Sequence, residues 1–164
     1  MKSLNQNNKI CIIDHAGHTS QFDLAITLAK NNHNVIFAYT KNLSTPNANF
    51  QRHKNLKIVP IELGKNFNKY NYFIRVVDEI RLGFLQVKLI KRTMPFIVQS
   101  ANNPLLSQFL LAVYCRFKKI LFINWITDLL GVGIKKTLKR KHFLLSFFVG
   151  GFFSLLEKIC ALIS

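Results

Sequence analysis

The chain of 164 residues has the length of one domain and leaves no room for a second full one. Apolar residues make up 49% of it and include 15 phenylalanines, so a sizeable core can form and wholesale disorder is excluded. The formal net charge of +16 predicts attraction to polyanions, which could be nucleic acid, anionic lipid or phosphorylated substrates.

The cysteines and the apolar segments bear on the compartment. Cys11, Cys115 and Cys160 are odd in number, far apart and surrounded by apolar residues, which predicts reduced core thiols in the cytosol. The first ten residues are polar and lack the apolar core of a signal peptide, so export is not expected. Residues 143–156 are the only membrane-like stretch, and they fall short of the roughly 20 residues that a spanning helix needs. A buried or interfacial helix is expected there.

Strand-like apolar runs alternate with helical periodicity along the chain. In chain order the pattern predicts a strand at residues 10–13, a helix ending at residue 30, strands at 35–39 and 58–61, a helix from 72 to 94, a strand at 96–98, a helix opening at 103–104, a strand at 120–125 and a last strand from residue 160. The polar stretch from residue 41 to 55 reads as a surface loop. The resulting prediction is one α/β domain, a Rossmann-like parallel sheet with helices on both faces.

Some helix positions carry more specific expectations. Thr19 or Ser20 is expected to cap the first helix, and Asn103 the third, with Pro104 at its first position. In the second helix, apolar and charged residues separate onto two faces. The apolar face consists of Phe73, Val77, Ile80, Phe84 and Val87, and the charged face of Arg75, Glu79, Lys88 and Lys91.

Three loops are expected at the carboxyl edge of the sheet, where open parallel sheets bind ligands: residues 14–18, 100–103 and 125–133. Gly17 precedes a helix amino terminus suited to a phosphate, although neither a dinucleotide fingerprint nor a P-loop is present. His15 and His18 lie close to Asp14, but no further ligand pattern completes a metal site, and none is expected.

Each candidate side chain has a structural alternative. Asp14 could cap a helix or order its loop, whereas His18 is balanced between a structural and a ligand role. Asn102 and Asn103 could bind substrate or serve as turn and cap residues. Asp128 follows a buried strand in a chain with only seven acids, so it could orient a sugar hydroxyl, act as a base or cap a helix. No nucleophile triad and no paired carboxylates are present.

A basic run followed by aromatic residues suggests contact with an anionic membrane surface. The residues expected to make this contact are Lys135, Lys136, Lys139, Arg140, Lys141 and Phe143. An ordinary core helix after a solvated turn, or a segment covered by another domain, would give the same pattern. Nucleic acid is not expected as a partner, because the charge is spread over the chain and no nucleic-acid-binding motif occurs.

Several segments in order resemble glycosyltransferase family 4, in the bacterial branch similar to colanic-acid and O-antigen sugar transferases. The segments that carry the resemblance are IDHAGH at residues 13–18, LAK at 28–30 with HNV at 33–35, SANNPL at 100–105, FINWITDLLG at 122–131 and LEK at 156–158 leading into ALIS at 161–164. The resemblance implies one half of a GT-B fold, in which the amino-terminal domain binds a glycan or lipid-linked acceptor and its first loop approaches the donor diphosphate.

The resemblance assigns roles to individual residues. Gly17, with His18 nearby, would approach the diphosphate, and Asp128 would lie near the reacting sugar. The family often has His-Asp in that later loop, where this chain has Thr127 and Asp128. The nucleotide-sugar donor would be a co-substrate, with no tightly bound cofactor.

The resemblance also implies a second domain, which in this family holds the nucleotide sugar and carries an acidic E-x7-E motif. The chain is expected to end before that domain, as a fragment, a truncated gene product or a half-enzyme with a separate donor subunit, and to be inactive without it. The expected location is the cytoplasmic face of the plasma membrane. The alternative is a non-catalytic basic Rossmann-like module that docks on membrane or on a partner protein.

Overall fold

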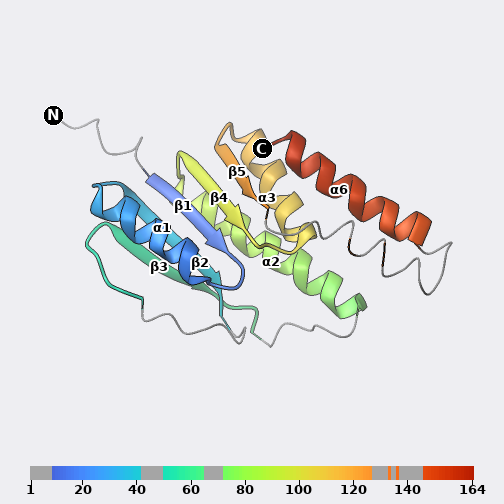
Figure 1. Ribbon diagram of the computed structural model, residues 1–164, viewed down its shortest axis with the longest axis horizontal. Helices are drawn as coiled ribbons and strands as arrows, with labels where there is room; N and C mark the ends of the chain where they lie inside the picture. Colours follow the sequence, from blue (N-terminus) through green and yellow to red (C-terminus); the bar gives the residue numbers. More distant parts are fainter. Residues whose placement is uncertain (1–8, 42–49, 65–71, 127–132, 134–135, 137–145) are drawn as a thin grey trace.

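The computed structural model describes residues 9–41, 50–64, 72–126, 133, 136 and 146–164, which form a parallel sheet with helices on both faces (Figure 1). The strands are β1 (Lys9–Asp14), β2 (Asn34–Thr40), β3 (Leu56–Ile61), β4 (Ile97–Ala101) and β5 (Leu121–Trp125). Their order in the sheet is β3-β2-β1-β4-β5, and every neighbouring pair is parallel. The expected Rossmann-like α/β architecture is confirmed.

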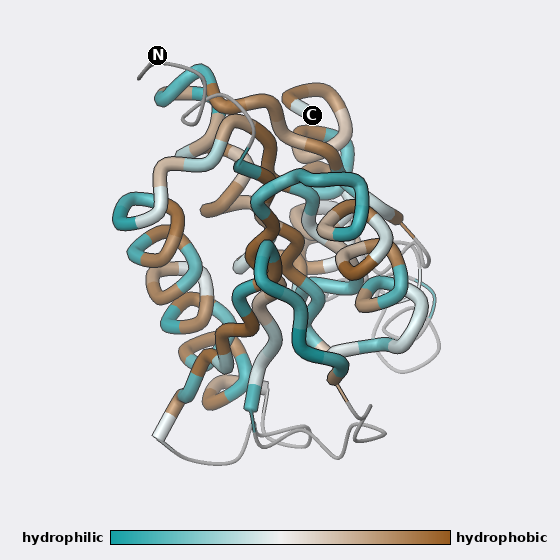
Figure 2. Tube along the Cα trace, turned by 90° about the vertical axis from the view of Figure 1, so that its left-hand side faces the viewer, coloured by the Kyte–Doolittle hydropathy of each residue, from teal (hydrophilic) through white to brown (hydrophobic). Residues whose placement is uncertain are grey.

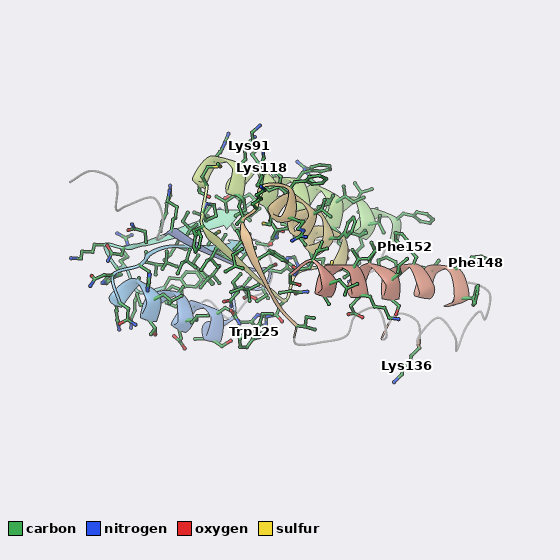
Figure 3. The ribbon with its side chains drawn as sticks, turned by 90° about the horizontal axis from the view of Figure 1, so that it is seen from above. Lys91, Lys118, Trp125, Lys136, Phe148 and Phe152 are labelled. Carbon is green, nitrogen blue, oxygen red and sulfur yellow. The ribbon has the colours of Figure 1, made fainter. Side chains whose placement is uncertain are left out.

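The helices form two layers around this sheet. Helix α1 (Thr19–Lys30) covers one face, and helices α2 (Tyr72–Thr93) and α3 (Leu105–Phe117) cover the other (Figure 3). A π-helical turn, η1 (Ser146–Gly150), leads into α6 (Gly151–Leu162), which packs on α3.

Two apolar cores lie on opposite sides of the sheet. Ile12 belongs to the core under α1, whereas Cys11 and Ile13 belong to the core under α2 and α3. Successive side chains of a strand point to opposite faces, so a strand that is covered on both faces has a continuous apolar sequence. In Figure 2 these apolar strands run through the middle of the molecule, between the helices.

The strand expected from residue 160 is wrong, because helix α6 occupies residues 151–162. Leu156 and Cys160 are four residues apart, and both are buried against Leu105 of α3. A short apolar run does not by itself distinguish a buried strand from a helical segment. Here the i, i+4 spacing places both side chains on the helix face that packs on α3.

The helix starts differ by one residue from the expected positions. Helix α1 begins at Thr19 with His18 as its N-cap, and α3 begins at Leu105 with Pro104 as its N-cap. Neither N-cap residue makes a side-chain capping hydrogen bond. The expected capping roles of Thr19, Ser20 and Asn103 are therefore wrong.

The apolar face expected for α2 packs inward only at Val87. Phe84 is 61% exposed and Val77 is 60% exposed, whereas Asp78 and Glu79 are buried. The reason lies at the contact with α3, where the Glu79 carboxylate lies 3.5 Å from the Leu106 amide in the first turn of that helix. A helix amino terminus favours negative charge, so α2 presents an acid to it.

Gly83 allows α2 and α3 to approach closely. A Cβ atom on Gly83 would lie 2.8 Å from Cδ1 of Leu110 and 3.1 Å from Cα of Ser107. The Ser107 hydroxyl donates a hydrogen bond of 2.6 Å to the carbonyl oxygen of Glu79 across the same contact. The inward face of α2 is thus set by a close, partly polar contact with α3.

No helix in the part of the chain that the structure describes is long and apolar enough to cross a bilayer. Of the residues expected to contact a membrane, Lys136 is described and exposed. Lys135, Lys139, Arg140, Lys141 and Phe143 lie outside the described residues.

Candidate functional site at the carboxyl edge of the sheet

The ends of β1 and β4 bring two of the predicted loops together. Asp14, the last residue of β1, pairs in register with Ala101 of β4 and with Tyr39 of β2. The backbone amide of His15 also donates a hydrogen bond of 3.3 Å to the carbonyl oxygen of Ala101. The loop after β1 therefore lies beside the residues that follow β4, where a parallel sheet binds its ligands.

Asp14, His18 and Asn102 form a hydrogen-bonded cluster at this edge. The Asp14 carboxylate is fully buried and accepts a hydrogen bond from the backbone amide of His18. Its Oδ2 lies 3.0 Å from Nδ1 of His18, and its Oδ1 accepts a hydrogen bond of 2.9 Å from the Asn102 side-chain amide. One buried carboxylate thus orders two loops that are 88 residues apart.

The contact with Asp14 orients the imidazole of His18. A carboxylate can only accept, so this contact favours a proton on Nδ1, which also lies 3.2 Å from the Asn102 amide nitrogen, and leaves Nε2 for other partners. The His18 side chain is 47% exposed. Nε2 can therefore accept a hydrogen bond from a hydroxyl group in the neutral ring, or donate one to a phosphate oxygen in the charged ring.

Gly17 has a backbone conformation that favours glycine. Its φ is +70°, in the left-handed region, and its amide donates a hydrogen bond of 3.2 Å to the carbonyl oxygen of Asp14. A Cβ on Gly17 would lie 3.4 Å from Cβ of Tyr39, so the φ angle, more than the available space, disfavours substitution. The tight turn that results brings His18 back over Asp14.

A second contact fixes the same loop to β2. Nδ1 of His15 lies 3.0 Å from the Thr40 hydroxyl, and the Thr40 backbone amide donates a hydrogen bond of 3.2 Å to the carbonyl oxygen of His15. The two histidines of the loop therefore point to different partners.

Asn103 lies in the interior and not at the open edge. Its Oδ1 accepts a hydrogen bond of 2.8 Å from Gln86 of α2, and its side-chain amide donates to the Ser100 hydroxyl. Ser100 in turn donates to Gln108, whose amide donates a hydrogen bond of 2.7 Å to Asn124. This buried chain of amides links α2, β4, α3 and β5, so Asn103 positions the loop and does not face the space beside His18.

The remaining predicted residues are placed as follows. Asp128, the predicted catalytic residue, lies outside the described residues, three positions after the end of β5. Trp125 ends β5, pairs in register with Ala101 and is half exposed (Figure 3). Among the described residues, no group of three or more His, Cys, Asp or Glu side chains could hold a metal ion.

Sequence reasoning missed two features of the site. It named Asn102 and Asp14 separately, but not the hydrogen bond between them. It also missed the buried amide chain through Gln86 and Gln108. Polar amides within otherwise apolar helix patterns are the only sequence signal of such a network, and they do not identify their partners.

The cysteines contribute no reactive group to the site. All three are buried free thiols, as predicted. Burial raises the pKa of Cys115 to about 12, and burial together with the nearby Glu157 raises that of Cys160 to about 11. Burial, with a smaller contribution from Cys115, also strongly raises the pKa of Cys11. Thiols that stay protonated are poor nucleophiles.

The molecule is thus a Rossmann-like α/β domain with a polar cluster at its carboxyl edge. Comparison with protein-family models, with curated proteins and with solved structures finds no significant match to the chain. An interpretation of its function therefore depends on the geometry of the site and on the motifs in its sequence.

Proposed function

We propose that this chain is the acceptor-side domain of a retaining, nucleotide-sugar-dependent glycosyltransferase of the GT-B type that acts on a lipid-linked or cell-surface polysaccharide precursor. The observation that carries the proposal is the Asp14–His18–Asn102 cluster at the carboxyl edge of the sheet. The glycosyltransferase motifs at residues 13–18 and 100–105 contribute all three side chains.

The cluster suits the polar groups of such a reaction. His18 holds Nδ1 against Asp14 and directs Nε2 toward a hydroxyl or phosphate oxygen. Gly17 forms the turn that brings His18 to this position. Asp14 acts through His18, which makes it a positioning residue, while Asn102 fixes the neighbouring loop.

The donor is a nucleotide sugar, held by a second Rossmann-like domain across a cleft. Transfer requires donor and acceptor to be held together in a water-poor space, so both sides of the cleft are needed. Asp128 is the proposed catalytic residue. The acceptor is lipid-linked, and the protein works as a peripheral protein at the cytoplasmic face of the plasma membrane.

Deletion of the gene, followed by complementation, tests this proposal. We expect deletion to remove or shorten a surface polysaccharide on gels, and the wild-type gene to restore it. His18→Ala and Asp128→Ala should fail to restore the polysaccharide at wild-type protein levels. His53→Ala is the matched control, since His53 lies before β3 and outside every segment that carries the resemblance.

Full restoration by both His18→Ala and Asp128→Ala would overturn the proposal. That result would favour the alternative, a non-catalytic basic module whose function does not need the cleft. The net charge of +16 supports this alternative because it gives the chain affinity for anionic surfaces without catalysis.

A further inference from the structure

Helix α2 buries two acids beside its apolar core residues Leu82 and Ile90, and it also exposes several apolar side chains. Asp78 is fully buried and Glu79 nearly so, with Glu79 accepting a hydrogen bond of 2.9 Å from Arg75. Val77 and Phe84, by contrast, are both more than half exposed. The outer face of a surface helix normally carries polar and charged residues, so an exposed apolar face is suited to an apolar environment.

The outward face changes character along the helix. Val77, Ile80 and Phe84 are exposed and follow one another in steps of three and four, so they form one stripe. The same line continues through Lys88 and Lys91, which are also exposed, so their expected placement on a separate charged face is wrong. Lys91 stands on the side of the molecule opposite α1 (Figure 3). We define this line, from Val77 to Lys91, as the α2 stripe.

We propose that the α2 stripe binds the surface of an anionic lipid bilayer. Its apolar turns enter the boundary between headgroups and acyl chains, and its lysines contact the anionic headgroups. This division between apolar and cationic side chains is characteristic of interfacial helices. The proposal deepens the proposed function, because a lipid-linked acceptor requires the protein at a membrane.

The chemistry of the stripe favours a bilayer over two other occupants. A second copy of the chain would bring together two molecules that each carry a net charge of +16, which opposes association. Nucleic acid would bind the lysines but would leave Val77, Ile80 and Phe84 in contact with water. Of these three occupants, the bilayer is the one that offers both negative charge and an apolar interior.

Vesicle binding by the full chain tests the apolar part of the stripe. The probe is a sedimentable vesicle of phosphatidylglycerol and phosphatidylethanolamine. We expect Val77→Gln/Phe84→Gln to lower the partition coefficient at least about tenfold, since both side chains would enter the interface. The matched control is Leu121→Gln/Ile123→Gln, which removes two exposed apolar side chains from β5. These alternate with Phe122, which faces the α2 and α3 side, so they lie on the other face of the sheet.

A charge reversal tests the cationic part without touching any apolar contact. Each cation near an anionic surface contributes about fivefold to binding, so Lys88→Glu/Lys91→Glu should reduce binding at least about twentyfold. The control with the same charge change is Lys30→Glu/Lys54→Glu. Lys30 ends α1, and Lys54 precedes Asn55, whose side chain donates a hydrogen bond to the carbonyl oxygen of Ala29. This control should bind several-fold more tightly than the stripe variant.

Three results would overturn the proposal. The first is wild-type vesicle binding by both stripe variants. The second is an equal loss of binding in the stripe variants and their controls. The third is a wild-type dimer, seen by sedimentation equilibrium, that Val77→Gln/Phe84→Gln dissociates while vesicle binding is unchanged. Because no sugar transfer is measured, an inactive protein that still binds vesicles through the stripe would refute only the proposed function.

Discussion

Replacing Asp14 by Asn tests whether one buried carboxylate holds the site together. The substitution keeps the size of the side chain but turns one acceptor oxygen into an amide that donates. Asp14 accepts from the His18 backbone amide, from His18 Nδ1 and from Asn102. At least one of these donors must then face another donor in a position where the side chain is fully buried.

The size of the effect depends on which of these groups can reach water. The His18 side chain is half exposed, so its ring can turn to solvent at little cost. The His18 backbone amide is held in the N-cap of α1 and has less freedom. Leaving such a donor unsatisfied costs about 1–3 kcal/mol, which we expect as the loss in free energy of unfolding. For a chain of this length, each kcal/mol lowers the melting temperature by about 2–4 °C.

Urea unfolding and nitrogen NMR of the histidine rings measure the two consequences. Asp23→Asn, on an exposed position of α1, is the control and should leave stability unchanged within about 0.5 kcal/mol. In the wild-type protein we expect neutral His18 to carry its proton on Nδ1, and Asp14→Asn should shift it toward the other tautomer. Wild-type stability in Asp14→Asn, together with an unchanged tautomer, would refute the role of Asp14 as the positioning residue.

Three further substitutions test the interior. Gly83→Ala should lower the free energy of unfolding by up to about 2 kcal/mol, because overpacking costs about 1–3 kcal/mol and the higher helix propensity of alanine returns about 1. The control Gly151→Ala, whose added Cβ meets nothing within 4 Å, should be neutral or stabilising. Equal urea midpoints for the two variants would contradict the close α2–α3 contact. Asn103→Ala should destabilise by about 1–3 kcal/mol by leaving the Gln86 amide unsatisfied, and a loss below 0.5 kcal/mol by chemical denaturation would contradict the buried network. Burial raises the pKa of Cys160 to about 11, so the folded chain keeps a proton that the unfolded chain loses above its ordinary value of 9.0, and stability should fall as the pH rises from 9 toward 11. The urea midpoint of Cys160→Ala should fall less steeply over that pH range than that of the wild-type protein. The same pH dependence of the midpoint in both proteins would contradict the raised pKa of Cys160.

The strands were the easiest elements to predict from the sequence. Runs such as residues 10–13 and 35–39 are continuously apolar because helices cover both sides of the sheet, and burial on both faces requires apolar residues at successive positions. Helix α1 was equally clear, since Phe22, Ala25 and Ala29 all enter one core. The alternation of strands and helices then indicates a parallel sheet, because parallel strands need a crossover connection, which is usually a helix.

The face of α2 could not be predicted in the same way. Periodicity shows which side chains share a face of a helix, but not which face meets the sheet. That choice depends on Gly83, which allows close approach to α3, and on Glu79, which lies beside the first turn of that helix. Both effects involve residues more than 20 positions away, so they become visible only when the helices are packed. The contact between Asp14 and Asn102 is hidden from the sequence for the same reason.

The site and the α2 stripe are related by the topology of the fold. In a parallel sheet each connecting helix runs back against the strands, so the amino-terminal turns of α2 lie toward the edge at which β1 and β4 end (Figure 1). The apolar part of the stripe occupies these turns, and the lysines occupy the turns farther from that edge. When the stripe binds a bilayer, the end of the molecule that carries His18 would therefore lie closest to the hydrocarbon region. A lipid-linked acceptor has its reactive headgroup at that same boundary, so one orientation on the membrane would satisfy both proposals.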